Sequence, residues 1–470
     1  MPLTSPSTWD QSLTVDPALS PHSSVSASVS TRVVSSLQRW HNLSRALRLR
    51  DPSANLERTV NRCFALFFEY LYPLTPLVHE PSLRDGLDFF VTQSSGINQS
   101  THHAEPVAIS EVGTTFVPGN NSAGGNILNR TNGLKYPELW PDSTFTLITA
   151  VCAEAAFLLR NDIFPEGETI ADIFLQASRD CLNSNLEADL EYPNANSVAI
   201  RYFHSNCLHA AGKPKYSWHI FGEATRLAQV MQLHEESSLE GLLPVEAELR
   251  RRAFWIVYVG DKSAAILNNR PITIHKFSFE SGITTAFPTG IEDEMAVSPG
   301  TVAQDASRKS FITGFNANLR LWQAAWDLIL EMRLLQNRKD VVLIGQQQLT
   351  AEERLRLDSL YVYFMTCLDD LPPYLQTDTF VAGRPGENMQ LKQYIIQCAN
   401  LQVSQHCLRM VITQRFEDLE FFAPGIEHTD MLLVRKTEIA RDMLRVIREA
   451  PFWSLQVNGE PCVSHFLSDA

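Results

Sequence analysis

The feature that most constrains the fold is a run of seven apolar residues, Ala253–Val259, which directly follows three arginines, Arg250–Arg252. An almost unbroken apolar run of this length is buried, as a helix or as a strand. The segment opens at Pro244, and the carboxylates Glu246 and Glu248 follow closely. Proline fits the first turn of a helix, where carboxylates also face the positive end of the helix dipole. The sequence therefore predicts a helix whose first turns are charged and whose second half lies in the core.

Helical spacing of apolar residues recurs along most of the chain from Leu56 onward. One such set consists of Leu319, Trp322, Trp326, Ile329 and Leu330. We find no alternating strand pattern in the sequence and no hairpin turn between two such patterns. Because 44% of the residues are apolar, the chain can bury a substantial core. The predicted fold class is all-α, a large multi-helix domain with long mobile loops and a disordered N-terminus.

Composition divides the chain into three parts. Residues 1–31 are rich in Ser, Thr and Pro with few large apolar groups, so this segment is predicted to be disordered. Residues 32–55 are predicted to form a basic linker, and residues 56–470 a helical domain. Within that domain, residues 92–134 are rich in Gly, Ser, Asn and Thr and predict a loop insertion, and residues 276–310 predict a second loop.

The chain is acidic, with a net charge of −14. Because phosphate backbones repel an acidic surface, we expect this chain to contact DNA only weakly or indirectly. The exception is the segment from Arg32 to Arg62, which carries seven arginines against Asp51 and Glu57. This segment is interpreted either as a solvated helix face or as a nuclear-import or DNA-proximal segment.

The sequence predicts a soluble intracellular protein. No signal peptide is visible at the N-terminus, and the longest apolar stretch, Phe145–Leu159, is interrupted by Glu154 and too short to cross a bilayer. The eight cysteines include no C-x-x-C pair. We therefore predict reduced thiols in the core, no metal site and no membrane segment.

The sequence lacks the common catalytic patterns: a glycine-rich phosphate loop, an H-E-x-x-H zinc motif and a G-x-S-x-G nucleophile turn. Asp369 and Asp370 invite comparison with all-helical prenyl-diphosphate enzymes, which hold magnesium through an aspartate-rich helix face. Here Asp369 and Asp370 are followed by Pro372 and Pro373, and no further carboxylate lies on the same helix face. The two aspartates therefore predict a helix end and a turn. We predict no catalytic, cofactor-binding or metal-binding residues.

Two further segments allow more than one interpretation. Phe416–Phe422 interleaves acids with bulky apolar residues, which is typical of a transactivation segment or of an amphipathic turn at a helix end. Arg250–Arg252 could form a phosphate-binding patch. Beside Phe254 and Trp255, however, their stems can lie on apolar surface while the guanidinium groups pair with acids such as Glu246 or Glu248.

Four segments, in this order along the chain, resemble the middle homology region of fungal zinc-cluster transcription factors. They are Phe67–His79, Gly222–Glu235, Pro244–Ile272 and Leu371–Leu375. The third is similar to the family's most marked signature. Its matching positions are Arg250, Arg251, Arg252, Phe254, Trp255, Asp261, Arg270 and Pro271. We expect the role of these residues to be structural.

The resemblance implies an all-helical regulatory domain and not an enzyme. Such a domain restrains or licenses transcriptional activation, sometimes in response to a small-molecule effector. It implies a nuclear regulator of RNA polymerase II genes in a metabolic or secondary-metabolite pathway. The expected partners are the transcription machinery or other transcription factors, and a homodimer or heterodimer is possible.

This sequence departs from the family pattern at both ends. The family places a six-cysteine zinc cluster before this region as its DNA-reading module, and no such pattern occurs here, so we expect no zinc or other cofactor in this chain. We expect a chain shortened at both ends or a naturally cluster-less member. Two alternatives stay open: a cluster-less binding module that acts only through partner transcription factors, and an all-α prenyl-diphosphate enzyme.

Overall fold

The computed structural model describes residues 35–100, 141–290, 311–341, 349–382, 389–421 and 426–458. These ranges contain helices, turns and irregular segments without any β-strand, which confirms the predicted all-α class. The predicted disordered segment 1–31 lies outside the described residues, as do most of the predicted loop 92–134 and residues 291–310 of the predicted loop 276–310.

The α-helices are α1 (Ser36–Arg50), α2 (Leu56–Leu66), α3 (Glu80–Ser100), α5 (Pro141–Leu158), α6 (Gly167–Ser184), α7 (Leu186–Glu191), α8 (Ala195–Ala210), α9 (Pro214–Val230), α10 (Pro244–Leu267), α12 (Phe311–Val341), α13 (Ala351–Thr366), α14 (Thr379–Ala382), α15 (Met389–Asp418), α16 (Ile426–Glu449) and α17 (Phe452–Gln456). A π-helical turn, η1 (Phe67–Leu71), continues α2, and the 3₁₀ turns are η3 (Glu236–Leu239), η4 (Lys276–Ser278) and η5 (Pro373–Leu375).

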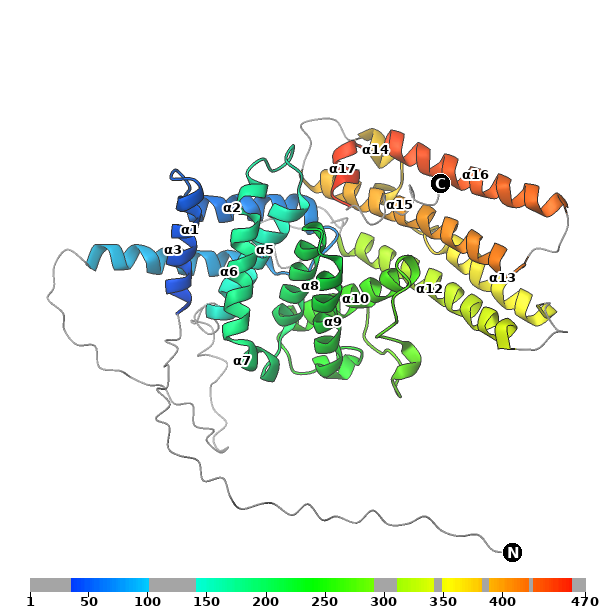
Figure 1. Ribbon diagram of the computed structural model, residues 1–470, viewed down its shortest axis with the longest axis horizontal. Helices are drawn as coiled ribbons and strands as arrows, with labels where there is room; N and C mark the ends of the chain where they lie inside the picture. The colour runs from blue at the N-terminus through cyan, green and yellow to red at the C-terminus, as the bar shows by residue number, and fades with distance from the viewer. Residues whose placement is uncertain are drawn as a thin grey trace, which may run out of the picture. The chain divides into compact units, whose positions relative to one another are not determined.

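Two sets of helices pack side by side, and α10 contacts both. In the first set, α5 packs against α6 and α8, and α8 packs against α9 (Figure 1). In the second set, α12 packs against α13 and α15, and α15 packs against α16. Helix α10 contacts α8 and α9 on one side and α12 on the other. Because sixteen of its side chains are buried, α10 belongs to the core through most of its length.

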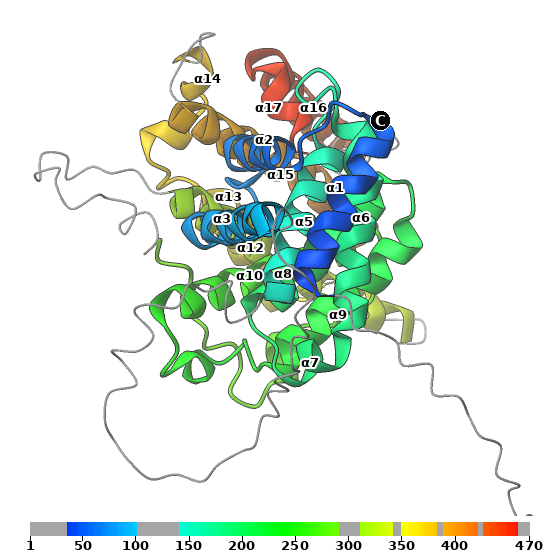
Figure 2. The ribbon, with the colours of Figure 1, turned by 90° about the vertical axis from the view of Figure 1, so that its left-hand side faces the viewer.

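The predicted basic linker 32–55 is wrong for residues 36–50, which form helix α1 and pack on α3, α5 and α6 (Figure 2). Trp40, Leu43 and Leu47 are buried, and the Trp40 ring stacks on Phe90 with 5.3 Å between the ring centroids. These apolar residues share one helix face, while Arg45, Arg48 and Arg50 are exposed to solvent. Arginine content alone indicates a linker here, whereas the spacing of Trp40, Leu43 and Leu47 indicates the helix.

The predicted loop 92–134 is wrong at its beginning, because α3 continues to Ser100. Serine usually weakens a helix by competing for backbone hydrogen bonds. Here the Ser94 hydroxyl donates to the carbonyl of Phe90 within the same helix, at 2.7 Å, so the hydroxyl is satisfied without ending the helix. The described part of the other predicted loop, residues 276–290, contains η4 and otherwise irregular chain, as expected.

The seven described cysteines are all free and buried, in agreement with the predicted core thiols. Cys462 lies outside the described residues. None of the helices in the described part of the chain combines the length and the apolar character that a membrane crossing needs.

Helices α9 and α10 approach each other closely at a glycine. A Cβ added to Gly260 on α10 would lie 2.6 Å from Cζ of Phe221 on α9, closer than two carbons can pack. Next to Phe221, Gly222 has open space where its Cβ would be. Gly260 therefore allows the close contact between α9 and α10, whereas Gly222 has no packing role and only lowers the helix propensity of α9.

Gly260→Ala is expected to lower the free energy of unfolding by about 1–3 kcal/mol, because the Phe221 ring must move out of its packed position. Gly222→Ala is the matched control and should raise the stability by roughly 0.5–1 kcal/mol through helix propensity. Urea unfolding followed by circular dichroism measures both. Equal effects of the two substitutions would contradict the close helix contact.

Helix α5 carries a carboxyl group into the core. Glu154 is fully buried; its Oε1 accepts from Nδ2 of Asn206 at 2.8 Å, and the Cys207 thiol lies 3.7 Å from its Oε2. Burial raises the pKa of Glu154 from its ordinary 4.5 to about 8, against the weaker opposing effect of these hydrogen bonds. The folded protein thus retains this proton at pH values where the unfolded chain has lost it.

This pKa predicts a pH-dependent loss of stability. Between pH 4.5 and about 8 the unfolded chain releases the Glu154 proton and the folded chain does not, so stability falls as pH rises and the decline ends near the folded-state pKa. Glu154→Gln keeps the shape and removes the titration. Its stability advantage over the wild type should grow by at most about 1.4 kcal/mol per pH unit across this window. Urea unfolding at several pH values measures the stability of both proteins. If the two stabilities change with pH in parallel, the raised pKa of Glu154 is refuted.

Candidate functional site: the clamped helix α10

Helix α10 begins as the sequence predicts, with Pro244 in its first turn and Glu246 close behind. The predicted pairing of arginines with acids is present. Arg250 Nε lies 2.7 Å from Glu246 Oε1, and Arg252 Nε lies 3.0 Å from Glu248 Oε1. The first pair is partly exposed, whereas both side chains of the second pair are fully buried.

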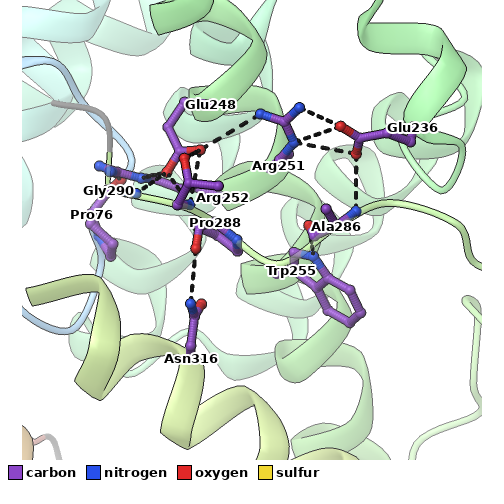
Figure 3. Close-up of polar contacts among 11 residues, drawn as sticks. Pro76, Glu236, Glu248, Arg251, Arg252, Trp255, Ala286, Pro288, Gly290 and Asn316 are labelled. Atoms are coloured by element: carbon purple, nitrogen blue, oxygen red, sulfur yellow. Dashed lines mark hydrogen bonds and ion pairs between the residues drawn. The ribbon is translucent and has the colours of Figure 1, made fainter.

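The buried carboxylate of Glu248 joins α10 to an irregular segment, residues 285–290, which we call the strap (Figure 3). Besides Arg252, Glu248 accepts from the backbone N–H groups of Thr289 at 3.1 Å and Gly290 at 3.2 Å. The Thr289 hydroxyl adds a further hydrogen bond at 3.3 Å. Since a buried charge is tolerated only when it is paired and hydrogen-bonded, this carboxylate fixes the strap where it crosses α10.

Arg252 extends the same network to the N-terminal part of the domain. Its Nη1 donates to the Tyr72 hydroxyl at 3.2 Å and to the Pro76 carbonyl at 3.4 Å. These two residues flank the turn after η1, within the first segment of the family resemblance. One ion pair thereby holds together three segments that are far apart in the sequence.

A second set of contacts holds the other end of the strap. Arg251 forms a forked ion pair with Glu236, whose second oxygen accepts from the backbone N–H of Ala286 at 2.9 Å (Figure 3). The hydrogen bonds from Arg251 lower the pKa of Glu236, so this carboxylate stays charged. Trp255 donates from Nε1 to the Ala286 carbonyl at 2.8 Å. Its ring packs edge to face against the Phe287 ring, with 4.7 Å between the ring centroids.

Helix α12 contacts the strap as well, since Asn316 Nδ2 donates to the carbonyl of Pro288 at 2.9 Å (Figure 3). The strap is therefore bound to η3, α10 and α12 at the same time.

Asp261 plays the corresponding role near the C-terminal end of α10. It is fully buried and accepts from the backbone N–H groups of Thr273 at 2.9 Å and Ile274 at 3.1 Å, and from the Thr273 hydroxyl. The neighbouring Lys262 ammonium lies 3.0 Å from Asp261 and also donates to the Ile274 carbonyl. Burial lowers the pKa of Lys262, and the charge of Asp261 opposes this shift.

The remaining signature residues lie around these two clamps without forming one cluster. Phe254 is buried in the core, and the Arg270 guanidinium lies over the Trp218 ring, 5.6 Å from its centroid. Pro271 is exposed. Hydrogen-bonded buried charges fix the position of the backbone segments that they contact, and Glu248 and Asp261 act in this way.

Several residues of this site were not predicted from the sequence, namely Glu236, Lys262, Thr273, Thr289, Gly290 and Asn316. For Lys262 there was a signal, because a charged pair at the end of an apolar run must be satisfied when it is buried. For the other residues, no pattern in the sequence indicates a contact with the buried charges of α10.

Outside α10, the predicted helix end and turn at Asp369–Asp370 is confirmed, and the described residues 416–421 agree with the amphipathic-turn interpretation of Phe416–Phe422. Helix α13 ends at Thr366, and Asp370 lies beyond it in a turn, where it pairs with Arg320 at 2.7 Å. Helix α15 ends at Asp418, and Phe416 and Leu419 turn into the core, as an amphipathic helix end requires. Among the described residues, no three or more His, Cys, Asp or Glu side chains gather as a metal site would need.

Residues 65–355 match the fungal specific transcription factor domain, a match that covers more than half of the chain and includes α10 and the strap. The chain belongs to this family. The sequence resemblance to the regulatory region of fungal transcription factors is thereby confirmed.

Short segments of the chain are similar to known fungal transcription factors. The aurofusarin cluster transcription factor of Gibberella zeae is 52% identical over 50 residues, which cover 11% of this chain and 8% of the relative. A citrinin biosynthesis transcriptional activator of Monascus ruber is 29% identical over 134 residues, covering 26% of this chain and 25% of the relative. The ascochitine biosynthesis cluster transcriptional regulator of Didymella fabae is 30% identical over 115 residues, which cover 22% of this chain and 19% of the relative. The chain thus matches a quarter or less of the length of each. No solved structure matches the chain.

Glu248→Gln is expected to destabilise the folded chain by about 3–5 kcal/mol, because it leaves the Arg252 guanidinium buried beside a neutral amide. It should also release the strap, so the backbone N–H groups of Thr289 and Gly290, which donate to Glu248, should exchange with deuterium faster than in the wild type. Glu438→Gln, at an exposed position on α16, is the control and should change stability by less than about 0.5 kcal/mol. A Glu248→Gln variant with wild-type stability and wild-type hydrogen exchange in the strap would contradict the clamp.

Proposed function

We propose that this chain regulates transcription of a fungal secondary-metabolite pathway, as the helical regulatory domain of a transcription factor. The observation that carries the proposal is the family match over residues 65–355. It is supported by the relatives, which are named as factors of the aurofusarin, citrinin and ascochitine clusters.

The chemistry of α10 supports a regulatory scaffold over an enzyme. The α10 carboxylates Glu248 and Asp261 are buried, and their oxygens accept hydrogen bonds from backbone N–H groups of the strap and of residues 273–274. A catalytic acid or base must instead reach a substrate proton. On this proposal the signature residues, including Arg250, Arg251, Arg252 and Trp255, stabilise the domain.

We further propose that the chain acts in the nucleus through the transcription machinery or other transcription factors, and that it contacts DNA only weakly. The net charge of −14 opposes a DNA backbone. Helix α1 departs from this acidity, because Arg45, Arg48 and Arg50 are exposed on it and it contains no carboxylate. A second copy of the chain and a small-molecule effector are further possible partners within this proposal.

Tethering tests the regulatory role directly. The chain is fused to a DNA-binding module of unrelated origin, and transcription of a reporter with that module's site is measured in a fungal host. The expected result is a several-fold change in reporter transcript relative to the module alone. The Glu248→Gln variant should lose most of this change and Glu438→Gln should keep it. An unchanged reporter at equal protein level would refute the proposal.

A DNA-binding titration of the purified chain distinguishes indirect from direct action. With mixed genomic fragments, binding should be weak at physiological salt, with a dissociation constant no tighter than about 10⁻⁶ M, and should strengthen steeply as salt is lowered. Tight, salt-resistant binding to particular fragments would show that this chain reads DNA itself and would contradict the proposed dependence on partners.

A further inference from the structure

Helix α16 carries two apolar stripes, and only one of them is covered. The covered stripe, Ile439, Met443 and Val446 with Ala450 just beyond the helix end, is buried. Met443 and Val446 pack with Val403 of α15, and Ala450 packs with Ile395 and Cys398 of α15. Contact with α15 therefore accounts for one face of the helix.

The second stripe consists of Leu433, Thr437, Ala440, Leu444 and Ile447, and we call it the open stripe. Its residues follow each other at spacings of four and three, the pattern of a helix face that packs on another helix. It lies about 100° around the helix axis from the covered stripe. Leu433 is 64% exposed, Leu444 52% and Ile447 48%. Apolar side chains aligned in this way on a surface are typical of an interaction site.

A surface pocket of about 560 Å³ lies on the open stripe, and its described lining belongs to α16 alone. The lining includes Ala440 and Leu444 of the stripe together with the charged residues Arg441, Arg445, Arg448 and Glu449. Arg445 pairs with Asp442 at 3.2 Å. In the described part of the chain, Arg441 and Arg448 have no carboxylate partner.

We propose that the open stripe docks an acidic amphipathic helix of a partner protein. The apolar side chains of such a helix would pack against Leu444 and Ile447, and its carboxylates would pair with Arg441 and Arg448. This occupant fits better than a second copy of the chain. In a symmetric pair, the arginines beside one open stripe would lie close to the same arginines of the other copy, and like charges would repel.

Fluorescence anisotropy with the full chain tests the proposal. The probe is a labelled helical peptide with Leu on one face, at spacings of three and four, and Glu on either side. Its counterpart has Lys in place of each Glu. The Glu peptide should bind at least about tenfold more tightly at low salt, and the preference should shrink at high salt as the charges are screened. Equal affinities for the two peptides would overturn the proposal.

Variants on the open stripe locate the site. Leu444→Asp with Ile447→Asp should weaken Glu-peptide binding about tenfold or more. Arg441→Glu with Arg448→Glu should reverse the preference toward the Lys peptide, an outcome that a misfolded variant cannot produce. Val362→Asp, at a 59% exposed position on α13, is the matched control and should leave binding unchanged.

Two other results would overturn the proposal. If sedimentation shows a dimer of the wild-type chain that Leu444→Asp dissociates, a second copy occupies the open stripe. If Val362→Asp weakens binding as much as the stripe variants do, the peptide binds elsewhere.

Discussion

The interaction on which the surroundings of α10 depend is the buried carboxylate of Glu248. A charge in the interior costs several kcal/mol unless charged and hydrogen-bonding groups surround it. Here the compensation comes from the Arg252 guanidinium within the helix and from two backbone N–H groups of the strap. Arg252 in turn donates to Tyr72 and Pro76. None of these segments can move alone without leaving a buried group unsatisfied, so they hold one arrangement together.

Asp261 applies the same physical solution near the other end of α10, where it fixes residues 273 and 274 by their backbone N–H groups. Backbone donors are well suited to this purpose, because they specify where a segment lies without requiring particular side chains along it. Helix α10, which contacts α8, α9 and α12, is thus tied to the strap and to residues 273–274. This explains how a sequence signature concentrated in one helix can govern structure well beyond that helix.

The sequence predicted what depends on local spacing. The charged start of α10, its buried second half and the pairs Arg250–Glu246 and Arg252–Glu248 all follow from helix geometry, since residues four apart lie on one face. The partners of Glu248 in the strap lie 41 and 42 residues further along, and nothing in their own residue types indicates the contact. Helix α1 was missed for a different reason: its arginines dominated the composition, while the three apolar residues of its buried face were too few to stand out.

The packing of α1 has a practical consequence for producing the protein. An expression design that starts at residue 56, where the charge-based boundary placed the domain, removes Trp40, Leu43 and Leu47. The Phe90 ring would lose its stacking partner, and apolar surface of α3 and α6 would face water. Such a fragment would be recovered in aggregates or bound to chaperones. A fragment that starts at or before Ser35, whose hydroxyl caps α1, keeps this surface covered.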